Sequence, residues 1–184
     1  MRRRFPLPAA ALVALPAVAG CGGGGPTYPE SGLRFYKASL VPTDTTRTEG
    51  AAFFDVVGGD LRVRVHATGV EPGQHIPQHL HANRGCDPGG PVVLNLDAGL
   101  TVPGEAPATG AAFPLASRAG VIDYEAARPL DELRSAIVTW GGPGLDDTGD
   151  LLAYLDLEDR NVHLHVGVGP PFPAVTCGGV EQIH

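Results

Sequence analysis

Two short histidine pairs, His79-Leu80-His81 and His163-Leu164-His165, are the residues of this chain best suited to chemistry. Side chains two positions apart in an extended strand point to the same face, so each pair can direct two imidazoles at one point. Neutral imidazole is the commonest ligand for copper and zinc, and a site of three or four nitrogens suits either metal. The pairs indicate a metal site, and hydrogen-bonded structural histidines are the alternative interpretation.

The surroundings of the histidine pairs favour copper. His75 lies just upstream of the first pair, and a cysteine follows each pair, Cys86 and Cys177. Neither cluster contains an aspartate or a glutamate. An all-nitrogen site favours copper over calcium, over magnesium and over a closed zinc site built from cysteines. His66 instead alternates with two arginines opposite an apolar face, which is typical of a solvated surface histidine.

Short strands are the elements that must position these histidines. The 26 glycines and 18 prolines are spread along the chain with short apolar runs between them, which is typical of an all-β sandwich or barrel. Residues 33–184 are long enough for one such domain. We expect one short helix at residues 129–137 and long loops at 97–117 and 141–149. The expected strands span residues 33–41, 50–57, 61–67, 75–81, 91–96, 136–139, 151–157, 162–168 and 174–180.

The N-terminal segment predicts export. Three arginines precede an apolar run that is too short to span a bilayer, as in a signal peptide. Val18-Ala19-Gly20-Cys21 resembles the lipobox of bacterial lipoproteins, which implies cleavage before Cys21 and attachment of lipid to it. Residues 1–20 are then the signal peptide, and the Gly/Pro-rich residues 21–32 form a flexible tether. An ordinary signal peptide without lipid is the alternative.

Export changes the charge and the cysteine balance of the mature chain. The formal net charge of −7 becomes −10 when residues 1–20, with three arginines and no acids, are removed. Such an acidic domain is a poor candidate for nucleic acid or for anionic lipid, so we expect membrane contact through the lipid anchor only. Outside the cytoplasm, Cys86 and Cys177 are expected to form a disulfide, with two unpaired buried thiols as the alternative. No protein partner is indicated.

The histidine and cysteine segments together resemble bacterial copper/zinc superoxide dismutases. The run from His79 to Cys86 is similar to the segment that carries two of that family's copper ligands and half of its disulfide. Residues 175–180 are similar to the closing segment that carries the other half. The spacing from Arg160 to His165 matches the family's Gly-Arg-x-x-x-x-His. The resemblance implies a Greek-key, immunoglobulin-like β-sandwich or flattened barrel, with copper held by His79, His81 and His165.

Two features of that family are not expected here. The dismutases carry three zinc-binding histidines and an aspartate after the disulfide cysteine, whereas no histidine lies between His81 and His163. No zinc site is therefore expected. The family also places an arginine that attracts superoxide three residues before the second cysteine, and that position is Ala174. An acidic chain without this arginine steers an anionic substrate weakly.

Bacterial CHRD-type domains provide a second resemblance, through residues 90–96 and Asn161-Val162-His163. It makes His163 rather than His165 the partner of His79 and His81, and it implies binding or a structural role. The sequence therefore leaves the third ligand open and offers His163 or His75 as a fourth. Three functions remain: a copper-binding domain, a copper-only superoxide dismutase, and a structural or interaction domain without metal.

Overall fold

The computed structural model describes residues 33–43, 47–86, 90–97, 99–105, 113–166 and 173–183. The expected signal peptide, Cys21 and the tether lie outside these residues. Among the described residues, no helix is long and apolar enough to cross a membrane.

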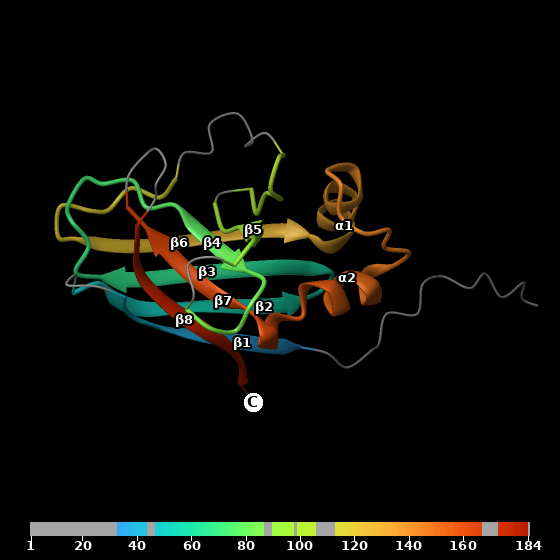
Figure 1. The fold of residues 1–184 in the computed structure, drawn as a ribbon, viewed down its shortest axis with the longest axis horizontal. Coiled ribbons are helices and arrows are strands. Elements are labelled where there is room, and N and C mark those ends of the chain that lie inside the picture. Colours follow the sequence, from blue (N-terminus) through green and yellow to red (C-terminus); the bar gives the residue numbers. More distant parts are fainter. Residues whose placement is uncertain are drawn as a thin grey trace, which may run out of the picture.

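Eight antiparallel strands form one sheet in the order β5-β4-β7-β8-β1-β2-β3-β6, which confirms the all-β prediction (Figure 1). β8 joins the two halves of this sheet, because it pairs with β1 on one side and with β7 on the other. The chain passes between the halves from β3 to β4, from β5 to β6 and from β6 to β7, as in a Greek key. The strands are β1 (Arg34–Pro42), β2 (Glu49–Val57), β3 (Asp60–Thr68), β4 (Gln78–His81), β5 (Val92–Asn95), β6 (Val121–Pro129), β7 (Asn161–His165) and β8 (Ala174–Ile183).

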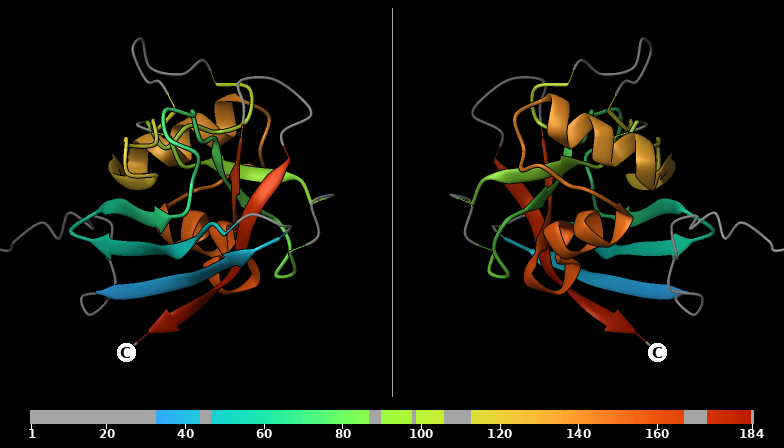
Figure 2. Two further views of the ribbon diagram at one scale, coloured as in Figure 1. Left: turned by 90° about the vertical axis from the view of Figure 1, so that its left-hand side faces the viewer. Right: turned by 90° about the vertical axis from the view of Figure 1, so that its right-hand side faces the viewer.

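The sheet curls around a single apolar core (Figure 2). β3 shows the expected alternation, with Leu61, Val63 and Val65 at most 1% exposed between outward-facing polar residues. Burial of such side chains is the main favourable term in folding. Where β8 crosses between the halves it must lie close to β1, and a Cβ on Gly178 would come within 2.2 Å of the Ser39 carbonyl oxygen.

Two of the expected strands, 136–139 and 151–157, are wrong, because both segments are mainly helical. α1 (Leu130–Thr139) extends the predicted helix, since Leu133 and Ile137 lie one turn apart and are both buried. α2 (Thr148–Leu155) begins at an N-cap, where the Asp147 side chain accepts a hydrogen bond from the Asp150 N–H. A short 3₁₀ helix, η1 (Leu157–Asp159), follows. The helices cover one end of the sheet (Figure 1).

The remaining differences concern strand ends and one missed strand. The strand β6 was not predicted, and it pairs with β3 over its whole length. β4 begins at Gln78 rather than at residue 75, because Pro77 lacks the N–H that a strand ladder requires. His75 forms an isolated bridge with Leu115 instead.

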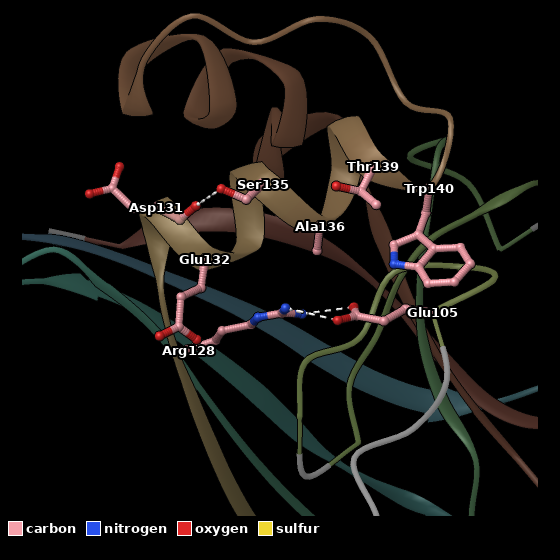
Figure 3. Close-up of a pocket in the computed structure, with 8 residues that line it drawn as sticks. All are labelled: Glu105, Arg128, Asp131, Glu132, Ser135, Ala136, Thr139 and Trp140. Carbon is pink, nitrogen blue, oxygen red and sulfur yellow. Dashed lines mark hydrogen bonds and ion pairs between the residues drawn. The ribbon is translucent and has the colours of Figure 1, made fainter.

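Arg128, on β6, binds residues 100–105 to the sheet through hydrogen bonds. Its guanidinium donates to both carboxylate oxygens of Glu105, each at 2.9 Å, and to the carbonyl oxygen of Leu100. Figure 3 shows this pair in a hollow beside α1, next to Trp140. The hydrogen bonds from Arg128 hold the pKa of the Glu105 carboxyl below its ordinary value. The folded state therefore favours the ionised carboxylate.

The Glu105 carboxylate should make the stability of the fold depend on pH. Because its pKa is lowered on folding, its contribution is present above the ordinary glutamate value of 4.5 and is lost as the pH falls below that value. Glu105→Gln should lower the free energy of unfolding by about 1.5–3 kcal/mol at pH 7, measured by urea denaturation. The difference from the native protein should shrink toward pH 3. Glu49→Gln, at an exposed position, is the control, and a Glu105 effect equal to it would contradict the prediction.

Candidate metal centre

The pairing of β4 with β7 brings both histidine pairs to one face of the sheet. The register places His79 opposite His163, and Gln78 opposite Leu164. Directly opposed residues in an antiparallel pair point to the same side, and residues two apart share a face. The leucines between the histidines, Leu80 and Leu164, are fully buried in the core. All four imidazoles therefore lie on the face opposite these leucines.

Three of these imidazoles converge. His79, His81 and His165 each offer a ring nitrogen, and these atoms all lie within 4.8 Å of one another. The ring centroids of His79 and His165 are 4.9 Å apart, and each lies 5.9–6.0 Å from that of His81. Nitrogens bound to one ion at about 2 Å are at most about 4 Å apart. Rotation of the rings that moves their nitrogens by about 1 Å would therefore bring all three within bonding distance of one metal ion.

Irregularities in the strands aim two of the three rings. The register shifts between Leu80 and His81 where β4 meets β5, and between Leu164 and His165 where β7 meets β8. Such bulges re-aim a side chain relative to a regular strand. Each shift falls directly before a histidine of the converging group. This feature was not predicted, because a bulge leaves no mark in a short run of alternating residues.

The other two candidate ligands occupy different positions. His163 lies on the same face and is fully buried, but it is outside the converging group. His75 is also outside the group, and its Nδ1 lies 3.1 Å from the carbonyl oxygen of Phe113. The position next to His165 on β8 is Ala174, which provides no cation beside the site.

The environment of His81 suits a metal ligand. Its Nδ1 donates a hydrogen bond of 2.7 Å to the carbonyl oxygen of Gly90, which leaves the lone pair on Nε2. This Nε2 is buried and has no hydrogen-bond partner among the described residues. Metal-binding histidines are typically held in this way, with the second nitrogen bonded to a carbonyl or a carboxylate. The donor set therefore fits a metal that prefers nitrogen.

Burial keeps two imidazoles of this site, those of His79 and His81, neutral. Burial, and to a smaller extent repulsion from His165, His81 and His163, together lower the pKa of His79 to about 4. Burial also lowers the pKa of His81, against an opposing effect of the hydrogen bond to Gly90. A metal binds only the neutral imidazole, so these ligands are ready for a metal at neutral pH.

Hydrogen bonds and a disulfide fix the loop that follows His81. The Asn161 amide group donates to the backbone oxygens of Asn83 and Gly85 and to the Asn83 side chain. Arg160 donates to the carbonyl oxygen of Ala82 and to two carbonyl oxygens of α2. These two residues hold the loop against β7 and α2.

The predicted disulfide between Cys86 and Cys177 is confirmed. It ties the end of the same loop to β8 and closes a chain segment of 91 residues. A crosslink of this span stabilises a fold by about 4–5 kcal/mol in the chain-entropy model. Cys177 lies opposite His163 in the register, so the disulfide borders the histidine face.

Comparisons with known proteins find similarity in solved structures. No model of a known protein family matches the chain, and no curated protein matches it. Two single-residue variants of Candida albicans superoxide dismutase 5 are similar to it, at 16% and 10% identity with TM-scores of 0.47 and 0.49. They cover 82% and 83% of this chain, and the alignment covers 90% and 93% of theirs. The Cu(II) form of that dismutase is similar at 13% identity, with a TM-score of 0.47, over 83% of this chain and 94% of its own.

Asn161 should be needed to hold the loop after His81. Asn161→Asp keeps the shape of the side chain but places a carboxylate against three oxygen acceptors in a fully buried position. The free energy of unfolding should fall by about 3 kcal/mol at pH 7, measured by urea denaturation with the disulfide intact. Asn83→Asp is the matched control, because it keeps the oxygen that Asn161 bonds. Equal stability of the two variants would contradict this assignment.

Proposed function

We propose that this domain binds one copper ion through His79, His81 and His165. The observation that carries the proposal is the convergence of three ring nitrogens within 4.8 Å of one another. The His81 ring also has a buried Nε2 without a hydrogen-bond partner among the described residues, while its Nδ1 donates to Gly90. The donors are all imidazole nitrogens, and no carboxylate belongs to the group. Copper(II) is favoured over zinc by such ligands in the general order of divalent metal affinities. Bound copper would supply one-electron chemistry.

The proposal includes export and a lipid anchor at Cys21. The N-terminal segment with its lipobox-like end supports both, and the disulfide is consistent with an oxidising compartment. An anchored domain on a glycine-rich tether would meet copper outside the cytoplasm. The anchor has its own test, in which labelled palmitate should be incorporated into the native chain and not into a Cys21→Ala variant. Equal labelling of the two chains would exclude it.

Removal of superoxide is the second activity that a copper site of this kind could support. His79 is only partly buried, so a small molecule could reach one side of the group. The Ala174 position and the acidic chain do not attract an anion. We therefore rank copper binding first and treat dismutation as a measurement on the same copper-loaded protein.

Copper uptake tests the proposal directly. The disulfide-intact domain should bind about one copper per chain, and a loss of one ligand should weaken binding by at least about 100-fold. Isothermal titration and metal analysis of His79→Ala, His81→Ala and His165→Ala should show this loss. His66→Ala is the matched control, because His66 is an exposed histidine on β3.

Two outcomes would contradict the proposal. Absence of copper at saturating concentration would favour a structural or interaction domain, in which histidine substitutions change stability alone. Equal weakening by His66→Ala and by the three ligand variants would indicate non-specific binding. Copper-loaded native protein that removes superoxide far faster than the His81→Ala variant would extend the proposal to a copper-only dismutase.

A further inference from the structure

His163 is the fourth imidazole on the histidine face, and the converging group does not include it. It lies on β7 between His79 of β4 and Cys177 of β8, with which it is paired in register on either side. Its side chain is 0% exposed, as is that of Cys177. His163 is therefore enclosed between the metal group and the disulfide.

The ring of His163 packs against the ring of His81. Their centroids are 4.3 Å apart with an angle of 35° between the planes, the shortest separation among the four histidines. The centroids of His163 and His165 are 5.6 Å apart. A centroid separation of 4.3 Å places the two rings in direct contact, in a tilted arrangement. Ligands of one ion instead point their nitrogens at a shared centre.

This packing supplies a constraint that the hydrogen bond to Gly90 does not. The bond from His81 Nδ1 fixes one nitrogen, but the ring can still tilt about that bond. A second ring in contact with the first limits this tilt and so restricts the direction of Nε2. The disulfide-bonded strand β8 backs His163, so this second ring cannot easily move away.

We infer that His163 is a positioning residue, which holds the plane of the His81 ring toward the metal and is not itself a ligand. The inference rests on the proposed copper site. It also decides between the two alternatives that the sequence leaves open, in favour of His165 as the third ligand. Residues that orient a metal ligand typically change metal affinity by 10- to 100-fold when replaced.

The test compares a variant that keeps a ring with one that removes it. His163→Phe retains a flat ring of similar size without nitrogens, and His163→Val provides a strand-favouring side chain without a ring. Both are loaded with copper(II) as disulfide-intact protein. Electron paramagnetic resonance reports the number of coupled nitrogens, and a competition titration reports the copper dissociation constant.

We expect His163→Phe to show the nitrogen coupling of the native protein and a dissociation constant within about threefold of the native value. His163→Val should keep the same number of nitrogens but bind copper about 10- to 100-fold more weakly, with an altered copper(II) spectrum. Circular dichroism of the metal-free variants should match that of the native protein. If His163→Val does not fold, the ring-retaining variant still decides whether His163 is a ligand.

Three results would overturn the inference. Loss of one coupled nitrogen in His163→Phe would make His163 a ligand. A native copper affinity and an unchanged copper(II) spectrum in His163→Val would show that the His163 ring does not orient the His81 ring. Both results require native protein that binds copper, so they leave the proposed function intact. A native protein that takes up no copper would overturn the proposed function and this inference with it.

Discussion

The antiparallel pairing of β4 with β7 sets His79 opposite His163 and Gln78 opposite Leu164. A slip of one residue would send one histidine pair into the apolar core and bring leucines to the histidine face, because side chains alternate along a strand. Burying two imidazoles in the apolar core without partners would be costly, whereas burying Leu80 and Leu164 is favourable. The hydrophobic pattern that folds the sheet thus also assembles the histidine face.

The second requirement is a fixed segment after His81, residues 82–86, because Asn83 of this segment lies against Gly90, whose carbonyl group orients the ring. Three kinds of contact hold it: the amide of Asn161, the guanidinium of Arg160 and the Cys86–Cys177 disulfide. Asn161 lies on β7 and Cys177 on β8, the strands that also carry His165 and border the site, and Arg160 directly precedes β7. Burial of His79 beside the other histidines lowers its pKa and keeps its imidazole available to a metal. The position of the segment after His81, the strands that hold it and the neutral state of the ligands are therefore all needed for a metal site here.

Much of this arrangement could be predicted from the sequence, since it follows from alternation and from residue type. The alternation of Leu61, Val63 and Val65 predicted which face of β3 is buried. The two His-x-His pairs predicted that the histidines of β4 and of β7 each share one face. The prediction failed where one pattern fits two structures. Leu151 and Leu155 suit a strand or one face of a helix, and the cap at Asp147 decides for the helix.

Long-range contacts were beyond the reach of the sequence. β6 carries Asp123 and Glu125 outward and buries only Ile122 and Ala126 deeply, so its apolar signal is weak without its partner β3. The bulge before His81 depends on how β4 pairs with β5, and the bulge before His165 on how β7 pairs with β8. The roles of Asn161 and Arg160 likewise depend on a loop distant in the chain.

The central claim is that His79, His81 and His165 hold one copper ion, and a crystal structure of the copper-loaded, disulfide-intact protein tests it most directly. Anomalous scattering at the copper edge should show one strong peak, about 2 Å from a ring nitrogen of each of these three histidines. The hydrogen bond from His81 to Gly90 should remain. A copper peak bound by other residues, or none at this face at saturating copper, would contradict the account.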